Sequence, residues 1–287
     1  MGKIRVRILD LPTTWDPFVS SHYAPFAEPA HETRAADLTL TCHQGEGVII
    51  PLPGPGEVPV IDVDRRPGDV YRIRSHWQDG QMNLQTGQAS ITLTDLHEMP
   101  LRMSLENFLR VACQLLLLQR HSFLLHSAGI LDEGRCFLFF GHSGAGKSTV
   151  TRLSQPRRAL SDDLVLVDAD PAAARIHVHA VPFFGAFPLK NRVRGHFPLA
   201  AAFRIRQDAS DRIEPLSTAR AAATLSASIP FVHELGATSD QLTDLVTHVV
   251  RTVAVKDLYF TLSTRFWDLI HAQGASGPHH REHHDEP

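Results

Sequence analysis

The stretch FLFFGHSGAGKSTV, residues 137–150, decides how the rest of the chain is interpreted. Apolar residues typical of a buried strand run directly into a glycine-rich segment, which is followed by residues that favour a helix. Gly141 to Ser148 fit the pattern G-x-x-x-x-G-K-[ST] at every fixed position. In that pattern the glycines let backbone N–H groups surround phosphate oxygens, and the helix N-terminus adds a partial positive charge. The stretch therefore predicts a P-loop between a strand and a helix.

The predicted phosphate-binding segment has nine consecutive residues. They are Gly141, His142, Ser143, Gly144, Ala145, Gly146, Lys147, Ser148 and Thr149. Lys147 is expected to supply a mobile charge during catalysis, and the Ser148 hydroxyl is expected to bind Mg²⁺. ATP and Mg²⁺ are therefore the expected cofactors. The alternative, a glycine-rich turn with an incidental lysine, does not account for the strand before it and the helix after it.

Carboxylates after the loop supply the remaining chemistry of a kinase, which needs one for the metal and one to take the acceptor's proton. Two candidates compete. Asp162 and Asp163 form an adjacent pair, whereas Asp168 ends the apolar run LVLVD in the form of an ordinary Walker B strand. The pair is favoured because one carboxylate can hold Mg²⁺ while its neighbour accepts a proton. The alternative is that the aspartate pair and Asp168 both lie in surface turns without a catalytic role.

Before the P-loop the sequence is rich in β-branched residues between Gly, Pro and Asp. Strands are expected within residues 37–44, 47–52, 58–64, 69–77 and 89–96, with an irregular run PLPGPGEVP at 51–59. Apolar residues at helical spacing predict a helix over 104–120, with Ser104 as its N-cap. Two short apolar runs, 123–131 and 135–140, then predict buried strands that lead into the loop.

After the loop, the sequence predicts a short helix closed by Pro156 and then strands on either side of a turn within residues 159–183. A further strand is expected at 201–207, and helices near 217–228, 239–252 and 265–272. The predicted fold class is α/β, a P-loop kinase core with a smaller β-rich N-terminal domain. The expected domains are residues 1–100 and 101–274, followed by a disordered His-rich tail at 275–287.

Composition narrows the classes of partner. A formal net charge of −3 gives no global reason to expect nucleic acid, although Lys190, Arg192 and Arg194 form a local basic cluster. Three widely spaced cysteines suit a reducing compartment. The start has no apolar core of signal-peptide length, and the most apolar helix candidate is interrupted by Arg110. A cytoplasmic protein without a nucleic-acid or membrane partner is expected, with a homo-oligomer left open.

The segments LLHSAGIL, LFFGHSGAGKST and ALSDDLVLV together resemble the catalytic core of HPr kinase/phosphorylase and its kinase-like relatives. The resemblance covers about residues 120–190. It implies that the P-loop holds the nucleotide, that Asp162 is the general base, and that Asp163 binds Mg²⁺ with Ser148. It also implies that His126 lies near the phosphates as a catalytic residue, although a histidine in an apolar run is otherwise often a core residue.

The chain departs from the bifunctional members of that family in two places. Their Glu-x-Arg-Gly signature is replaced by NRVRGH, with Arg192 in the glutamate's place, and Thr149 stands where they usually have Glu. The resemblance therefore does not extend to phosphorylase activity or a second metal contact.

The expected activity is an Mg-ATP-dependent kinase that phosphorylates a serine of a protein or peptide. The resemblance extends to relatives that modify precursor peptides, so the β-rich N-terminal module is a candidate docking place for the substrate. Two alternatives remain: a small-molecule kinase or carboxykinase-like enzyme, and a nucleotide-binding regulator without transfer activity.

Overall fold

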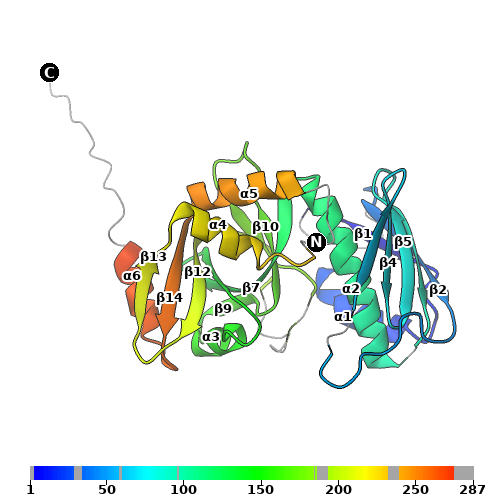
Figure 1. The fold of residues 1–287 in the computed structure, drawn as a ribbon, viewed down its shortest axis with the longest axis horizontal. Coiled ribbons are helices and arrows are strands. Elements are labelled where there is room, and N and C mark those ends of the chain that lie inside the picture. The colour runs from blue at the N-terminus through cyan, green and yellow to red at the C-terminus, as the bar shows by residue number, and fades with distance from the viewer. Residues whose placement is uncertain are drawn as a thin grey trace.

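The computed structural model describes residues 3–28, 34–57, 60–95, 97–183, 185, 193–231 and 239–274. In these parts of the chain the elements form a mixed α/β structure with two sheets and six α-helices (Figure 1). In chain order they are β1 (Val6–Leu9), α1 (Asp16–Tyr23), the 3₁₀ turn η1 (Ala24–Phe26), β2 (Leu38–Gln44), β3 (Asp62–Arg66), β4 (Val70–Ser75), β5 (Gln78–Asn83), β6 (Gln88–Leu93), α2 (Glu98–Leu118), β7 (Ser122–Asp132), β8 (Arg135–Phe140), α3 (Lys147–Leu153), β9 (Arg158–Ser161), β10 (Leu164–Asp168), β11 (His177–His179), β12 (His196–Gln207), β13 (Arg212–Pro215), α4 (Thr218–Ser226), α5 (Ser239–Thr252), β14 (Ala254–Phe260) and α6 (Phe266–Gly274).

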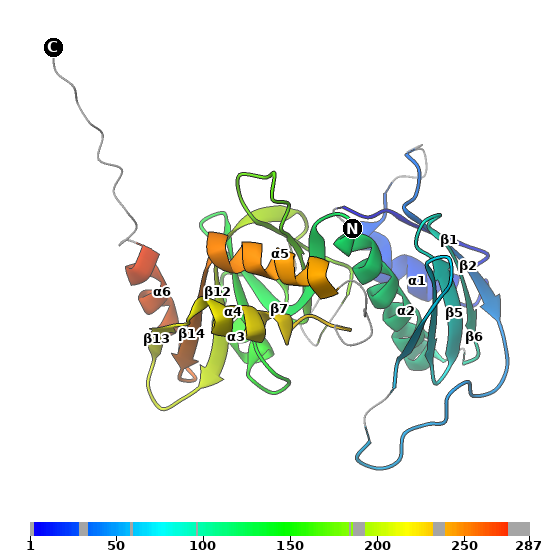
Figure 2. The same cartoon turned by 45° about the horizontal axis from the view of Figure 1, so that its top comes forward.

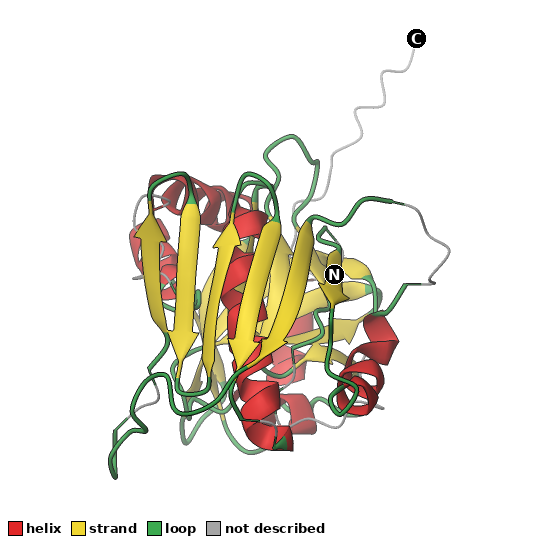
Figure 3. Ribbon diagram, turned by 90° about the vertical axis from the view of Figure 1, so that its right-hand side faces the viewer, coloured by secondary structure: helices red, strands yellow, loops and turns green. Residues whose placement is uncertain are grey.

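The first sheet has the order β1-β2-β6-β5-β4-β3, and α2 crosses one of its faces (Figure 3). Because one face of the sheet is covered by α2, buried and exposed side chains should alternate along each strand. In β4, Tyr71 and Ile73 are buried, whereas Arg72 and Arg74 lie on the opposite face. The helix approaches closely at Gly80, where a Cβ atom would lie 2.5 Å from the ring of Phe108. A side chain at this position would therefore separate the helix from the sheet.

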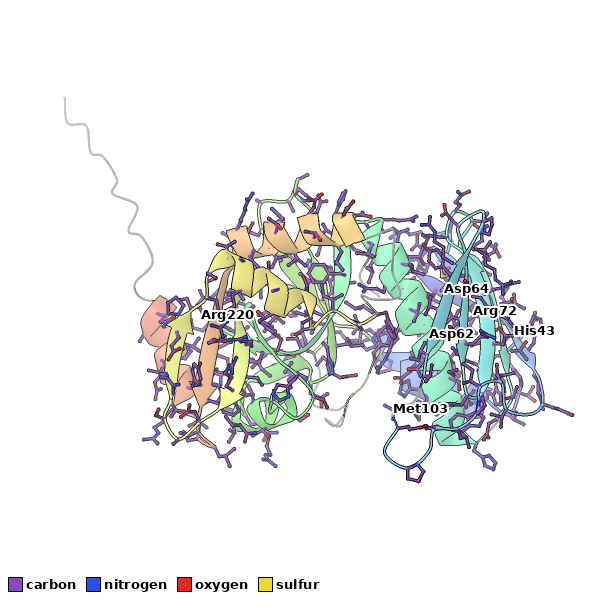
Figure 4. The ribbon with its side chains drawn as sticks, viewed as in Figure 1. His43, Asp62, Asp64, Arg72, Met103 and Arg220 are labelled. Atoms are coloured by element: carbon purple, nitrogen blue, oxygen red, sulfur yellow. The ribbon has the colours of Figure 1, made fainter. Side chains whose placement is uncertain are left out.

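The face of the first sheet opposite α2 carries charged side chains. Figure 4 places Asp62, Asp64 and Arg72 on this sheet, whereas Arg220 lies on α4 beside the second sheet. Cross-strand ion pairs join Arg72 to Asp79 and Arg74 to Asp62. These charges are paired with each other rather than directed at the P-loop.

Helix α2 begins earlier than expected. The sequence pattern predicted an N-cap at Ser104, but the helix starts at Glu98, and Ser104 is a buried residue inside it. The N-cap is His97, whose ψ of 146° is extended. Pro100 is tolerated because it lies in the first turn, where backbone N–H groups have no partner within the helix. The predicted N-cap was therefore wrong, because the helix includes residues 98–103, which precede the periodic apolar residues from which it was predicted.

Residues 47–52 were expected to form a strand and do not. The backbone there contacts a distant residue outside any ladder: Ile49 N–H donates to the carbonyl of His76 at 2.8 Å, and a ring nitrogen of His76 lies 3.0 Å from the Ile50 carbonyl. Both edges of β2 are already occupied, by β1 and β6. The expected irregular run after it is confirmed over its described part, 51–57.

The second sheet is ordered β11-β10-β7-β8-β12-β14-β13, with β9 beside β7. Strand β7 is long and takes part in three ladders: its first half pairs with β10, and its second half pairs with β8 on one side and β9 on the other. Strands β8, β12 and β14 run parallel to one another. Because carboxyl ends of parallel strands share one edge of a sheet, the end of β8 lies beside the end of β12.

Apolar side chains fill both faces of this second sheet. Along β8, Cys136, Leu138 and Phe140 join the larger core with α2, α4 and α5, whereas Phe137 and Phe139 join a second core with α3 and α6. Figure 2 shows α4 and α5 together over one side of the sheet. The near-continuous apolar run FLFF is thus explained by burial on both faces.

The predicted elements from β7 onward are confirmed within one to a few residues at their ends. The basic cluster is described only at Arg194, since Lys190 and Arg192 lie outside the described residues, as does the predicted tail at 275–287. Within the described chain, no helix combines the length and apolar character needed to span a membrane. The three cysteines are buried and unpaired.

Candidate active site

A cavity of about 400 Å³ opens at the carboxyl end of β8, where the glycine-rich loop begins. It is lined by His126, Ser143, Gly144, Gly146, Lys147, Ser148, Thr149, Asp162, Asp163, Gly185 and Gln207. The structure therefore brings together the loop, the aspartate pair and the histidine that the sequence singled out. Of the remaining loop residues, His142 is exposed and Ala145 is buried beneath the loop.

The loop conformation depends on glycine at two positions. Gly144 and Gly146 have φ values of 81° and 109°, in the left-handed region that side chains disfavour. At Gly146 a Cβ atom would also lie 3.0 Å from the ring of Phe260 and 3.1 Å from the amide nitrogen of Gln207. The loop is thus pressed against the ends of β12 and β14, which leaves room for a ligand only on the cavity side.

Lys147 is largely buried and folds back over its own loop. Its Nζ donates hydrogen bonds to the carbonyls of Gly141 at 3.0 Å and His142 at 3.2 Å. Burial lowers the pKa of this lysine, and the nearby charge of Asp163 opposes that shift. An anion in the cavity would strengthen the charged form of the side chain.

Asp162 is buried, with 3% of its surface exposed. Its Oδ2 lies 3.4 Å from the Ser148 hydroxyl, which can donate to it. The backbone of Gly185 covers the same carboxylate so closely that a Cβ atom there would lie 2.6 Å from Oδ1. Glycine at 185 is therefore required by the position of Asp162.

Asp163 is held between the side chains of His126 and Arg110. Its Oδ1 lies 3.1 Å from Nε2 of His126, and its Oδ2 accepts a hydrogen bond from Arg110 at 3.0 Å. Burial alone would raise the pKa of this carboxyl, but the hydrogen bond from His126 and the charges of Arg110, His126 and Lys147 outweigh it and hold the pKa below its usual value. Asp163 is therefore ionised before any metal is present.

Strand register explains why these residues meet. His126 pairs with Leu164, directly after the aspartates, and the next residue, Ser127, pairs with Phe140, directly before the loop. The N–H of Ser127 also donates to the carbonyl of Asp163 at 2.9 Å. The change of partner along β7 thus fixes the histidine between the loop and the acidic pair.

Asp168, the rival carboxylate, lies at the other end of β10. It pairs with Ser122 in the ladder and accepts a hydrogen bond from Lys3 at 2.6 Å. Asp168 lies four positions after Leu164, so the two residues are roughly 13 Å apart along the strand. It is not among the residues that line the cavity.

Sequence reasoning missed three residues at this site, one of which is Gly185, described above. Gln207 ends β12 and lines the cavity, and Arg110 on α2 contacts Asp163. A position at the end of a parallel strand could have indicated Gln207. Arg110 is conspicuous in the sequence as a charged residue inside an apolar helical run. Nothing in the sequence, however, indicated that its partner is Asp163, 53 positions later.

The oxygen atoms of this cavity fit Mg²⁺ better than a metal enclosed by protein ligands. Among the described residues, no three His, Cys, Asp or Glu side chains form a group that could hold a metal ion alone. Mg²⁺ characteristically uses one or two carboxylates together with water and phosphate oxygens. Ser148 and one of the two aspartates could supply its protein ligands: Asp163 is the predicted one, and Asp162 lies 3.4 Å from the Ser148 hydroxyl.

The described fold and cavity define a mixed α/β protein with a glycine-rich loop facing an adjacent pair of aspartates, of which Asp162 is buried. Residues 94–273, more than half of the chain, match the family described as SynChlorMet cassette protein ScmC. The chain belongs to this family. The matched range includes α2, the second sheet and every residue that lines the cavity. No curated protein matches the chain.

Proposed function

We propose that this protein is an Mg-ATP-dependent kinase, similar to HPr kinase, that transfers the γ-phosphate to a serine hydroxyl of a protein or peptide. The observation that carries the proposal is the shared cavity: Lys147 and Ser148 of the loop face the carboxylates of Asp162 and Asp163. A nucleotide-binding protein without transfer activity has no need for a base beside the phosphate site.

The loop would bind the β- and γ-phosphates through the N–H groups around Gly144 and Gly146 and through Lys147. For this, Lys147 exchanges its hydrogen bonds to the carbonyls of Gly141 and His142 for phosphate oxygens. Mg²⁺ would supply charge compensation for the transferred group when bound. Ser148 and one aspartate would hold it.

The acceptor serine must lose a proton as its oxygen bonds to the γ-phosphorus and ADP leaves. We assign the proton to the Asp162 carboxylate and the metal to Asp163, as the resemblance to HPr kinase implies. The 3.4 Å contact between Ser148 and Asp162 favours the reverse division, since the P-loop hydroxyl and the metal carboxylate are neighbours in P-loop proteins. Substitution of each aspartate, described below, separates the two assignments.

A peptide acceptor is supported by two observations. The family name places these proteins in a cassette, that is, beside other genes whose products can supply a substrate. The first sheet also stands beside the catalytic half and presents a broad polar face. A small-molecule kinase would not need such a surface.

The direct test is incubation of the purified protein with Mg-ATP and peptides encoded in the same cassette, followed by mass spectrometry. One added phosphoryl group on a serine supports the proposal, and the same peptide with that serine replaced by alanine must remain unmodified. Lys147→Ala serves as the inactive control. Nucleotide binding without phosphorylation of any cassette peptide would instead support the regulator.

A further inference from the structure

Charged side chains form a continuous path from α1 to the cavity. Nε2 of His22 lies 2.9 Å from Oε1 of Glu106, and Oε2 of Glu106 accepts a hydrogen bond from Arg110 at 3.0 Å. The same terminal nitrogen of Arg110 donates to Oδ2 of Asp163, also at 3.0 Å. The path thus connects α1 with Asp163, the aspartate that contacts both Arg110 and His126.

Glu106 and His22, the buried residues of this path, are stable there only when their polar atoms have partners. Glu106 and His22 are 4% and 8% exposed. A buried carboxylate is costly unless its oxygens are bonded, and here Oε1 is also reached by Nε of Arg102 at 3.1 Å. Glu106 therefore has fixed partners on both oxygens and in turn fixes Arg110.

The guanidinium of Arg110 is restricted on a second side. It lies over the ring of Phe183, 5.5 Å from the ring centre. Arginine keeps its proton in proteins, so this positive charge is present in every state of the site. Asp163 consequently meets a fixed donor rather than a mobile one.

We propose that Arg110 is a positioning residue that holds the Asp163 carboxylate in place for the metal ion. The inference rests on the proposed function, in which Asp163 binds Mg²⁺. A carboxylate has about four acceptor positions. Arg110 uses one on Oδ2 and His126 one on Oδ1, which leaves a position on each oxygen for a cation. Outer partners of metal ligands typically change metal affinity by about 10- to 100-fold.

The test measures Mn²⁺ binding to the full-length protein with ADP by electron paramagnetic resonance, which requires no acceptor. Arg110→Met should raise the Mn²⁺ dissociation constant by about 10- to 100-fold. Arg110→Lys should recover part of that loss because it keeps the charge. Arg102→Met is the matched control: it removes the other arginine on Glu106 but no contact to Asp163. It should change the constant by less than about threefold.

Binding of ADP without metal separates positioning from a general structural role. It should stay within about threefold of wild type in Arg110→Met, since Arg110 does not line the cavity. Unchanged Mn²⁺ affinity in folded Arg110→Met and Arg110→Lys would overturn the inference, as would an equal loss in Arg102→Met. If wild type binds neither ADP nor Mn²⁺, the proposed function itself fails.

Discussion

Lys147 donates hydrogen bonds to two carbonyls of its own loop in this structure. In the proposed kinase, nucleotide binding would replace these bonds with bonds to phosphate oxygens. A charge-assisted bond to phosphate is stronger than a bond to a neutral carbonyl. We therefore expect Lys147→Ala to weaken Mg-ATP binding by at least about 2 kcal/mol, roughly 30-fold, in calorimetry.

Arg152→Ala is the control, because this exposed arginine lies in the last turn of the same helix. Its affinity should equal that of wild type. An unchanged affinity in Lys147→Ala would show that the loop does not bind phosphate.

The aspartates are distinguished by what each variant loses. Asp162→Asn removes a proton acceptor while keeping size, so phosphate transfer should fall by roughly 10²- to 10⁴-fold with Mg-ATP affinity near wild type. Asp163→Asn should weaken Mg²⁺ binding, with partial rescue at high Mg²⁺. Asp168→Asn should change neither, because Asp168 pairs with Ser122 at the far end of β10. Kinetics at varied Mg²⁺ would measure all three.

Two patterns would change the assignment. Loss of Mg²⁺ dependence in Asp162→Asn, together with a rate defect in Asp163→Asn, would show the reverse division that the Ser148 contact favours. If only Asp168→Asn impaired Mg²⁺ binding, the ordinary Walker B strand would be restored.

His179 on β11 predicts a dependence of stability on pH. Burial lowers its pKa to about 4, nearby Asp168 opposes the shift, and the charge of His196 adds to it. Its Nε2 is 3.6 Å from Asp168, too long for a hydrogen bond. A depressed histidine pKa means that the unfolded chain binds the proton more tightly, so stability is full above about pH 6.5 and falls as the pH drops toward 4.

Between pH 7.5 and 5 this residue should cost about 2 kcal/mol of unfolding free energy. Urea unfolding at both pH values would measure the loss, and His179→Gln should show a smaller difference between them. An equal difference in the variant would place the pH dependence elsewhere.

The sequence predicted the site's residues where spacing is fixed by chemistry. The loop pattern and the adjacent aspartates are local in the chain, and the structure places them in one cavity. Arg110 could not be predicted in its role because its partner, Asp163, lies between β9 and β10 and comes within reach only when α2 packs against β7. Local pattern carries no information on that packing.

At the scale of elements, α2 depends on its close approach to the first sheet. Gly80→Ala places a methyl group 2.5 Å from the ring of Phe108, so either the ring or the helix must move. We expect a loss of about 1 to 3 kcal/mol in urea unfolding. Gly54→Ala is the control, because the nearest atom to its Cβ is 3.5 Å away, on the Glu57 side chain. Equal stability of both variants would show that the sheet yields at this contact.

Elements were predicted best where both faces of a strand are buried. The run before the loop and the helices after it agree with the structure, because continuous apolar strands and periodic helices give strong local signals. The eight-residue α1, with Pro17 in its first turn, was not predicted, and residues 47–52 were wrongly assigned to a strand. In the latter case the β-branched residues follow β2, which is already paired on both edges by β1 and β6.

At the scale of the whole molecule, the two sheets share one core. A single cluster of buried residues includes Leu40 of the first sheet, Phe108 of α2 and Leu124 of the second sheet. We therefore expect one cooperative unfolding transition. Buried Trp15 and Trp267 report on the two halves, so tryptophan-to-phenylalanine variants that leave one or the other should give coincident fluorescence curves in urea.

Separate midpoints would show that the halves fold independently. In that case a chain starting near residue 101 should still bind nucleotide. With coincident midpoints, the same truncation would expose the face of α2 that carries Phe108 and should lose solubility.

The three ladders of β7 also affect which parts of the protein open locally. Its amide groups have partners beyond the ladders: the N–H of Leu124 donates to the side chain of Gln114 at 2.7 Å, and that of His126 to the carbonyl of Ser228 at 2.8 Å. Amides bonded in this way exchange their hydrogens with solvent only when large parts of a structure unfold. We therefore expect the backbone at His126 to be among the last of the described residues to exchange, so that local opening around the cavity leaves the strand that carries His126 in place.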